Sequence, residues 1–378
     1  MKENNTINIT KGVYLLPWSE KDNPNGWIEP TTFCQLKCPG CYRGLDKKDY
    51  DHIHEDFLEL KKQIDNFLVN RNIQTLSIAG GEPLLYPKIN ELVSYANNNG
   101  LRVMIYTNGL ALTEEKIREL KNSGATQFVL HIDKFQGRVG YNNENDLLKL
   151  RDKYCNLFRK VGGVNLGFIQ PIAKDNLKDI NLLLDFYNRN IDIVNLVVFT
   201  LYREVCWDHA VKPNIDTNIS VEDVVIEIRQ RHKYEACSYL GSNKSINDPT
   251  WLFSIKVGIN GYLFGFLDGK IYKLIQERYR KNKGKYLFLT RKNKINILKL
   301  LRYFNFTSIL KIVFKYLKKK IINPLALSNT VYFQTMLILR GPEKQKGEWD
   351  LCQGCPDAMF YKDKLVPSCI LEEIKKKK

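Results

Sequence analysis

The chain has 378 residues, of which 44% are hydrophobic, so its length suits one large α/β domain with a smaller appendage, or two domains. Residues 1–12 are polar and argue against a secretory signal peptide, and no run of about 18 uncharged apolar residues predicts a membrane-spanning helix. The formal net charge is +17, but 17 Lys or Arg and one acid fall between Lys270 and Lys320, so the remainder is nearly neutral.

Short apolar runs alternate with longer amphipathic stretches between Trp27 and about Thr200. The runs are rich in β-branched and aromatic residues, as is typical of buried parallel strands. A strand followed by a helix, repeated about six times, predicts a parallel sheet with helices outside it. We expect strands at 27–33, 75–79, 102–107, 127–133, 164–170 and 194–199, and helices near 55–70, 88–99, 113–123, 143–160 and 177–188.

Polar or glycine-rich groups follow four of these expected strands, at Cys34, Gly80-Gly81-Glu82, Asn108-Gly109 and Asp133. Functional residues of parallel sheets and barrels lie just after the carboxyl ends of the strands. Their convergence therefore predicts a functional site at one end of the sheet.

The first of these groups is a cysteine array, TTFCQLKCPGCYRG, with the spacing C-x3-C-x2-C. Thiolates so close together in one loop can face a common centre, and soft sulfur ligands favour iron–sulfur clusters or zinc. A [4Fe–4S] cluster needs four ligands, so three cysteines would leave one iron free for a ligand that is not protein. A structural zinc loop is the alternative.

After residue 200 the alternation weakens, and residues 201–250 read as loop and helix. Residues 251–268 predict a hairpin that turns at Asn260-Gly261. In residues 295–322, apolar residues recur at helical spacing with lysines and arginines on the other face, and the window holds no acid. Four lysines form the tail, residues 375–378.

The basic segment has three interpretations. It is an ordinary amphipathic cap helix with a solvated face, a helix that lies on an anionic membrane surface, or a nucleic-acid contact. The basic residues alternate with aliphatic ones and no RNP1 or KH motif occurs, which argues against nucleic acid. We expect the protein to be cytoplasmic. A membrane contact would place it at the periphery of the membrane and would favour a lipid or polyprenyl-linked substrate.

A second cysteine group, CQGCPDAMFYKDKLVPSC, places Cys352, Cys355 and Cys369 in the spacing C-x2-C-x13-C. Nine cysteines without a secretory signal indicate a reducing compartment, where clustered cysteines more often bind metal than form disulfides. A structural zinc site would need a fourth ligand, for which Cys237, Cys206 or a histidine are candidates. The group could otherwise hold a second iron–sulfur cluster, or three free thiols.

Cys155 falls in an expected helix and is predicted to be a small core residue. Cys206 follows the sixth expected strand, so it is a candidate cluster ligand or a catalytic hydrogen-atom donor to a substrate radical.

The first cysteine array, together with GGEP after the second strand, resembles the radical S-adenosylmethionine (radical SAM) enzymes. The resemblance covers about residues 28–200 and implies an α/β partial (β/α)6 barrel with a C-terminal α+β cap. It implies a [4Fe–4S] cluster on Cys34, Cys38 and Cys41 whose open iron is chelated by the amino and carboxylate groups of SAM. The reduced cluster cleaves SAM to a 5′-deoxyadenosyl radical, which abstracts hydrogen from a substrate. A reductant such as flavodoxin or ferredoxin is implied as a partner.

The same resemblance implies roles for residues around SAM. The backbone of Gly80 and Gly81 would bind the amino group, assisted by Glu82, because glycine lets a backbone approach a ligand closely. Candidate contacts to the carboxylate and ribose are Asn108, His131, Asp133 and Gln170. The position before the third cysteine is usually aromatic in the family but is Gly40 here, so Tyr42 would take over the adenine contact. Gln136 and Arg138 are candidates to face the substrate.

The C-terminal cysteines resemble the auxiliary-cluster caps called SPASM and twitch, and their spacing is similar to that of the molybdenum-cofactor cyclase that acts on GTP. From this similarity we expect a second [4Fe–4S] cluster in this chain, but we do not expect GTP to be its substrate. The expected domains are 1–26 (N-terminal extension), 27–205 (barrel), 206–268 (connector and hairpin), 269–330 (basic segment) and 331–378 (auxiliary-cluster domain). The expected function is a radical SAM enzyme, an oxidoreductase or transferase. A SPASM-type peptide-modifying enzyme and a non-catalytic Fe–S or zinc scaffold are the alternatives.

Overall fold

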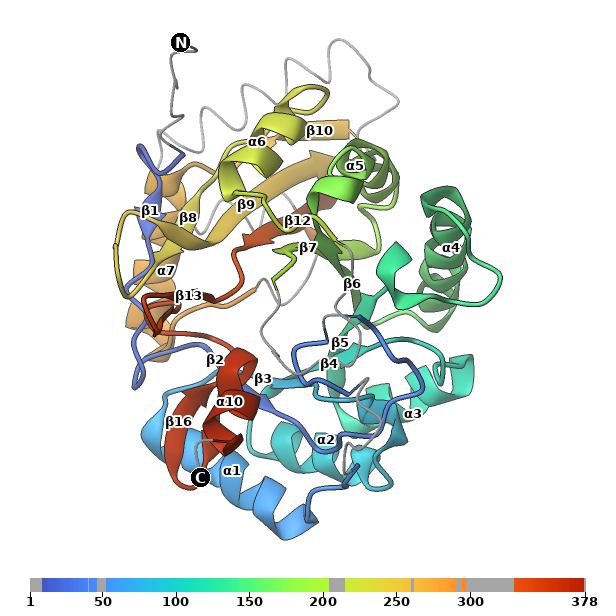
Figure 1. Cartoon of the computed structure of the whole chain (residues 1–378), viewed down its shortest axis with the longest axis vertical. Helices are drawn as coiled ribbons and strands as arrows, with labels where there is room; N and C mark the ends of the chain where they lie inside the picture. The colour runs from blue at the N-terminus through green and yellow to red at the C-terminus, as the bar shows by residue number, and fades with distance from the viewer. Residues whose placement is uncertain are drawn as a thin grey trace.

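The computed structural model describes residues 9–39, 41–45, 52–203, 215–259, 262–289, 294–296 and 330–376. One large mixed sheet organises this part of the chain, in the strand order β1-β8-β9-β12-β7-β6-β5-β4-β3-β2. Two further strands, β10 and β11, pair with β9 and β12 respectively. Helices α1 to α5 lie on the outer side of the curved sheet (Figure 1).

The parallel half of the sheet contains six strands that neighbour one another in chain order. They are β2 (Asn25–Ile28), β3 (Thr75–Ile78), β4 (Arg102–Thr107), β5 (Ala125–His131), β6 (Asn165–Ile172) and β7 (Val194–Leu201). The helices between them are α1 (Phe57–Asn70), α2 (Ile89–Asn98), α3 (Glu114–Ser123), α4 (Glu144–Val161) and α5 (Asp179–Arg189). The predicted partial barrel of six β/α units is confirmed, and in the described part of the chain the sheet does not close.

Local capping explains where the barrel helices begin and end. The Asp56 side chain accepts hydrogen bonds from the first-turn amides of α1, and Thr113 and Asn143 do the same for α3 and α4. Helix α3 ends at Gly124, whose φ of 110° is in the left-handed region that glycine tolerates. A Cβ at Gly124 would also lie 2.4 Å from the Asn97 side chain, so this cap fixes how α2 and α3 approach each other.

The first strand is shorter than predicted. It ends at Ile28, and Glu29–Phe33 form hydrogen bonds with the turn after β3 instead, through Gly81 N to Thr31 O and Glu82 N to Phe33 O. Pro30 has no amide hydrogen for a sheet ladder, which suits a strand that ends here.

Strand β12 (Thr330–Leu339) was not predicted. It lies between β7, to which it is parallel, and β9 (Pro249–Ile259), to which it is antiparallel. The sheet thus continues from the barrel into C-terminal sequence. The predicted hairpin is confirmed, because β9 pairs with β10 (Tyr262–Phe266) from Ile259 and Tyr262 onward.

The rest of this half includes β8 (Ser238–Gly241) and β1 (Tyr14–Leu15) at the sheet edge, with helices α6 (Val221–Arg229) and α7 (Gly269–Lys283). Of the predicted amphipathic helix at 295–322, the first two residues belong instead to β11 (Lys294–Asn296), which pairs with β12. The other residues of that helix lie outside the described part of the chain.

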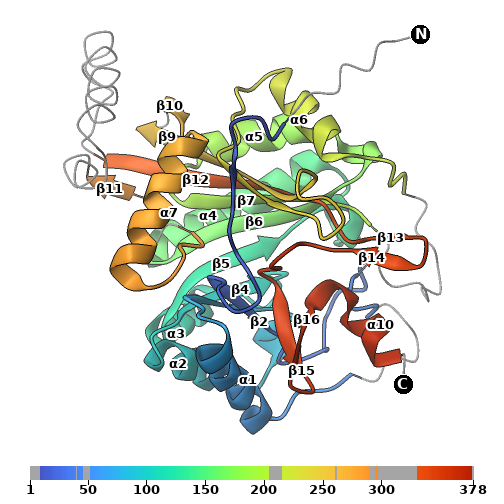
Figure 2. The same ribbon diagram turned by 90° about the vertical axis from the view of Figure 1, so that its left-hand side faces the viewer.

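The cysteine-rich C-terminus forms two small hairpins and a short helix. The hairpins are β13 (Glu343–Gln345) with β14 (Glu348–Asp350), and β15 (Ala358–Tyr361) with β16 (Lys364–Pro367). The helix is α10 (Leu371–Lys376). The second hairpin packs beside α1 and β2 (Figure 2). There the rings of Phe67 and Phe360 meet edge to face, with 4.9 Å between their centroids.

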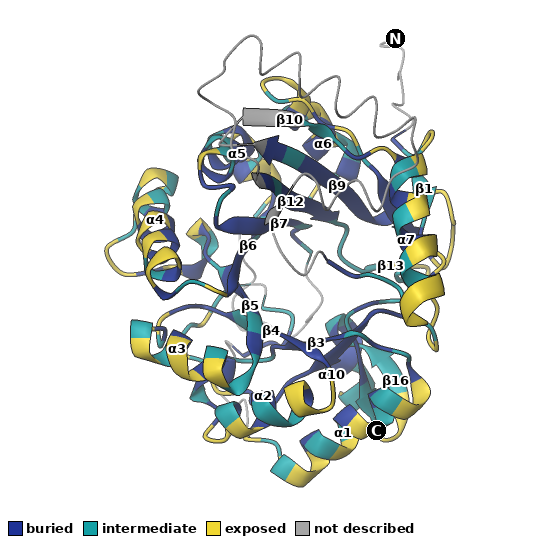
Figure 3. Ribbon diagram, turned by 180° about the vertical axis from the view of Figure 1, so that it is seen from behind, coloured by how far each residue is buried: buried dark blue, intermediate teal, exposed yellow. Residues whose placement is uncertain are grey.

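Two apolar cores lie on either side of the sheet, and the outer faces of the helices carry the exposed residues (Figure 3). The larger core joins the barrel helices to one face, and the smaller joins β8, β9, β12 and α7 to the other. Among the described residues, no helix combines the length and apolar character needed to cross a bilayer.

Candidate active site

A cavity of about 340 Å³ lies at the ends of the barrel strands, and both cysteine groups line it. We call them the first triplet (Cys34, Cys38 and Cys41) and the second triplet (Cys352, Cys355 and Cys369). Most of the remaining wall is apolar, and includes Trp27, Leu36, Leu45, Tyr106, Phe135, Ile169, Leu201, Tyr202, Trp251 and Leu339. Two segments that are more than 300 residues apart in the sequence therefore border one space.

The GGEP turn fixes the start of the loop that carries the first triplet. Gly81 N donates to Thr31 O at 2.8 Å, and Glu82 N donates to Phe33 O at 2.7 Å. A Cβ at Gly81 would lie 2.3 Å from Phe33 O, and Gly80 has a φ of 108°. Both glycines line the cavity, but their close approach is to the backbone of the cysteine loop.

Glu82 organises the site from behind the cavity wall. Its carboxylate is fully buried and accepts from Thr107 Oγ1 at 2.6 Å, from Asn108 N at 2.7 Å and from Leu84 N at 3.2 Å. Burial raises the pKa of Glu82, while these three hydrogen bonds lower it. The side chain that was predicted to assist in binding SAM therefore uses its oxygens to accept hydrogen bonds from the end of β4 and from the turn after β3.

Asn108 connects that carboxylate to the first triplet. Its side-chain nitrogen lies 2.9 Å from Gln35 Oε1 and 3.7 Å from Cys34 Sγ. Its carbonyl accepts from Arg138 Nη2 at 2.6 Å, and Arg138 also donates to His131 O and to Gln136 Oε1. Asn108 and Gln136 line the cavity, whereas Arg138 stands behind them.

His131 and Asp133 form a polar pair in the cavity wall, with Nε2 and Oδ2 2.7 Å apart. The other oxygen of Asp133 accepts from Phe135 N at 2.6 Å and caps the short helix Lys134–Gln136. The carboxylate is buried and the imidazole is 40% exposed. The pair can offer both donors and acceptors to hydroxyl groups in the cavity.

Gln170 lies apart from the other predicted SAM contacts. Its Oε1 accepts from Arg151 Nη2 and from Tyr187 OH, both at 3.1 Å, on the helix side of β6. Its neighbours Ile169 and Pro171 line the cavity. Successive residues of a strand face opposite sides of the sheet, so Gln170 faces away from the site.

Tyr42 lines the cavity and belongs to a buried polar cluster around Glu29. The carboxylate accepts from Tyr42 OH at 2.8 Å and from Trp27 Nε1 at 2.9 Å, and it pairs with Arg43 Nε at 2.8 Å. Arg43 also reaches Glu372 of α10 at 2.6 Å. The loop of the first triplet is thereby joined to the C-terminal helix. Gly40 lies outside the described residues.

Barrel side chains hold the loop of the second triplet by its backbone. Asn23 Nδ2 donates to Gly354 O at 2.8 Å, Asn25 Nδ2 donates to Pro356 O at 3.1 Å, and Arg71 Nη2 donates to Cys355 O. Gly354 has a φ of 62°, and a Cβ there would lie 2.2 Å from Trp18 O. This explains the glycine of the CQGC motif by close backbone packing.

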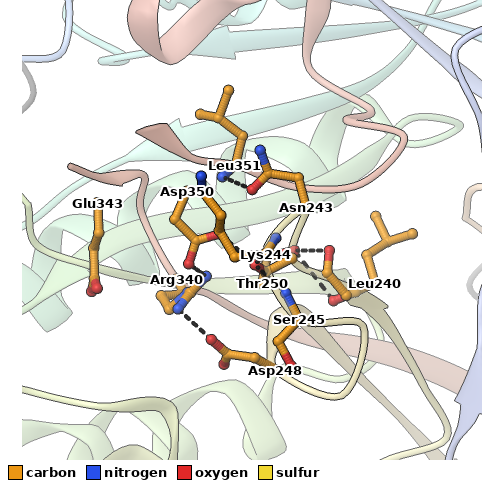
Figure 4. A network of polar contacts seen from close by, with 12 residues as sticks. Leu240, Asn243, Lys244, Ser245, Asp248, Thr250, Arg340, Glu343, Asp350 and Leu351 are labelled. Carbon is orange, nitrogen blue, oxygen red and sulfur yellow. Dashed lines mark hydrogen bonds and ion pairs between the residues drawn. The ribbon is translucent and has the colours of Figure 1, made fainter. Parts of the chain in front are cut away.

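A second polar network surrounds Arg340 and Asp350, shortly before Cys352 in the sequence (Figure 4). Arg340, just after β12, pairs with Asp248 at 2.6 Å and with Asp350 at 2.7 Å, and Ser242 Oγ donates to Asp350. Ser242 also forms a backbone bridge with Cys352. The network orients the segment that leads into the second triplet.

Burial changes the acidity of the thiols. It raises the pKa of Cys34, Cys38 and Cys41, with the nearby carboxylate of Asp133 adding to the effect at Cys38. In the second triplet, a hydrogen bond from Cys355 lowers the pKa of Cys352 to about 7, and burial raises that of Cys369. Metal binding would require these protons to leave.

Cys237 and Cys206 are the two cysteines predicted as possible fourth ligands of the second triplet. Cys237 is buried in the smaller core, with Sγ 3.4 Å from Phe253 O, and it does not line the cavity. Cys206 lies outside the described residues. Cys155 is a buried core residue of α4, as predicted. The sequence interpretation missed Asp350 and Asp357, which line the cavity, although Asp357 follows Cys355 by only two residues.

The donor set fits iron–sulfur clusters. Within the described ranges, no three His, Cys, Asp or Glu side chains are gathered closely enough to hold one metal ion. A cluster differs from a single ion because each thiolate binds its own iron, so the sulfurs need no common meeting point. Three thiols in each group, bordering a shared cavity, suit this kind of ligation.

Comparisons with known proteins agree with this donor set. The family model described as the radical SAM superfamily matches residues 28–186. The chain is 24% identical to an Fe-coproporphyrin III synthase of Methanosarcina barkeri over 220 residues, which cover 57% of this chain and 51% of that protein. It is 26% identical to a GTP 3′,8-cyclase of Helicobacter pylori over 174 residues, which cover 44% and 53%. The chain therefore spans about half the length of these curated relatives.

Among solved structures, the chain is similar to that of Streptococcus suis SuiB bound to S-adenosylmethionine. The TM-score is 0.43 at 19% identity, and the similarity covers 56% of this chain and 49% of SuiB.

Proposed function

We propose, from the match of residues 28–186 to the radical SAM superfamily model, that the chain is an enzyme that cleaves SAM reductively and abstracts hydrogen from a substrate. In this proposal Cys34, Cys38 and Cys41 hold a [4Fe–4S] cluster with SAM at its open iron. Cys352, Cys355 and Cys369 hold a second [4Fe–4S] cluster.

The observation that carries the proposal is that both triplets line one cavity. When bound, the first cluster and SAM would supply an electron and a 5′-deoxyadenosyl radical. The chain's residues bind and orient these groups and exclude water, which is the usual division of labour between a protein and its cofactor.

Individual residues take up these tasks at the cavity wall. The backbone at Gly80 and Gly81 would accept hydrogen bonds from the SAM amino group, and Asn108 would donate to its carboxylate. The His131–Asp133 pair would bind the ribose hydroxyls, and Tyr42 would pack near the adenine. Glu82 would act indirectly, since its oxygens already bond Asn108 N and Thr107. Gln170 has no part in this site.

The nature of the wall supports a substrate with an apolar portion. Trp251, Leu339 and Tyr202 line the cavity between the barrel and the second triplet, and Arg340 there is already neutralised by Asp248 and Asp350. Apolar walls favour apolar ligands. We therefore retain a lipid or membrane-associated substrate as the proposed class, with the enzyme peripheral to an anionic membrane.

Helix α7 supplies a surface for the membrane contact. Lys270, Lys273, Arg278 and Lys281 are exposed on it, and each would contribute roughly 1 kcal/mol near anionic lipid. Replacing all four by glutamine should reduce co-sedimentation with phosphatidylserine vesicles. Equal recovery of both proteins with these vesicles would contradict the proposed contact. Substitution is preferable to deletion because Tyr272 and Gln276 of α7 are buried.

The central test uses anaerobically reconstituted protein with dithionite and SAM. We expect release of 5′-deoxyadenosine, measured by chromatography, and its loss in Cys34→Ala. Cys155→Ala is the matched control, since Cys155 is a buried cysteine away from the cavity. The proposal would be contradicted if the reconstituted wild-type chain bound SAM but released no 5′-deoxyadenosine.

A further inference from the structure

Arg71 is a buried cation at the loop of the second triplet. It follows the last residue of α1, and its side chain is 1% exposed. Nε donates to Asn25 O at 3.0 Å, and Nη2 donates to Cys355 O. A barrel residue thus places a guanidinium against the backbone of a cysteine that lies 284 positions later in the sequence.

The partners of Arg71 differ from those of other buried arginines. Arg43 pairs with Glu29 and Glu372, and Arg151 pairs with Glu144. Arg71 has carbonyl partners, and in the described part of the chain no carboxylate lies within 4.0 Å of its nitrogens. A carbonyl dipole offsets only part of the free energy needed to bury a full charge.

Open space lies beside this guanidinium. Arg71, Cys352 and Cys355 line a second cavity of about 450 Å³, and the two cysteines also border the first cavity. Burial lowers the pKa of Arg71 to about 10, and the nearby carboxylates of Asp357 and Glu20 offset only part of this shift. Asp357 is held by Asn25 Nδ2 at 3.3 Å.

We propose that Arg71 is the counter-charge of the iron–sulfur cluster on the second triplet and that it raises the reduction potential of this cluster. The proposal rests on the proposed function, since that assigns a cluster to Cys352, Cys355 and Cys369. Three thiolates make an oxidised [4Fe–4S] cluster singly anionic and a reduced one doubly anionic. A fixed positive charge stabilises the reduced form more, so reduction by one electron becomes easier.

The test is a redox titration of the second cluster by electron paramagnetic resonance, with dithionite as reductant. The full-length chain carries Cys34→Ala, Cys38→Ala and Cys41→Ala, so that its signal comes from the second triplet alone. In Arg71→Gln we expect the equilibrium constant for reduction to fall about tenfold, which is about 59 mV toward lower potential for one electron. Arg71→Lys, which keeps the charge, should retain most of the original potential.

Arg102→Gln is the matched control. Arg102 is also a buried arginine that donates to a backbone carbonyl, that of Leu289, and it lines neither cavity. Its replacement should leave the potential unchanged.

The outcomes distinguish the inferred role of Arg71 from the proposal that the second triplet holds a cluster. An unchanged potential in Arg71→Gln overturns the inference, and so does an equal shift in Arg71→Lys and Arg71→Gln, which would show a positional role for the side chain. If the variant that lacks the first triplet binds no iron, the second triplet does not hold a cluster. The proposed two-cluster function is then contradicted, independently of the role of Arg71.

Discussion

At the scale of single residues, the site depends on buried polar groups that sit one layer behind the cavity. Glu82 bonds Thr107 and Asn108, Glu29 bonds Trp27, Tyr42 and Arg43, and Arg71 bonds the loop of the second triplet. Such groups stabilise one arrangement, because a buried polar group whose hydrogen-bond partner is removed still carries the free-energy cost of its desolvation.

Glu82→Gln tests this layer directly. The amide would present N–H hydrogens to Asn108 N or Thr107 Oγ1 in place of an acceptor, leaving a buried donor unsatisfied. We expect the free energy of unfolding of the metal-free chain to fall by about 1–3 kcal/mol, measured by urea denaturation. Glu119→Gln, an exposed substitution on α3, should change it little. Equal stability of the two variants would contradict the role given to Glu82.

The sequence predicted which residues lie at the ends of strands better than it predicted which side of the sheet each side chain faces. The positions of Gly80, Gly81, Asn108, His131 and Asp133 at the cavity follow from strand ends alone, whereas Cys34 lies six residues beyond the end of β2. Gln170 also ends a predicted strand, but β6 continues to Ile172 and presents Ile169 and Pro171 to the cavity. Because facing alternates along a strand, an error of one residue in register reverses the assignment.

At the scale of elements, alternation of apolar runs and amphipathic stretches was enough to predict six strands and five helices of the barrel. Strand β12 could not be predicted in its place, because pairing with β7 joins segments about 140 residues apart in the sequence. Likewise, no local pattern shows that Asn23, Asn25 and Arg71 bond the CQGC loop. Such contacts depend on tertiary packing, which periodicity does not record.

The contact between Arg43 and α10 gives a prediction at this scale. Glu372→Gln removes the carboxylate that joins α10 to the loop of the first triplet, so we expect a loss of about 1–3 kcal/mol in the free energy of unfolding. In a chain whose second triplet is removed by Cys352→Ala and Cys355→Ala, we also expect Glu372→Gln to lower the iron bound at the first triplet. Glu373→Gln is the control, since Glu373 bonds Lys344 and Trp349 instead. If both variants load iron equally, the helix does not position the loop.

At the scale of the whole molecule, one sheet runs from the barrel into the C-terminal sequence and brings two cysteine triplets to one cavity. The C-terminal hairpin β15–β16 and helix α10 pack on β2 and α1, and share an apolar cluster of Trp27, Ala79, Met359 and Leu371. The two triplets are therefore parts of one folded unit, which suits a reaction that uses both.

Iron stoichiometry tests the claim that this cavity is bordered by two clusters. Two [4Fe–4S] clusters predict about eight iron atoms per chain after anaerobic reconstitution. Removing either triplet by alanine substitution should leave about half, with the Mössbauer spectrum of a [4Fe–4S] cluster in each case. Unchanged iron in the Cys352→Ala/Cys355→Ala variant, or one zinc per chain at the second triplet, would contradict the account.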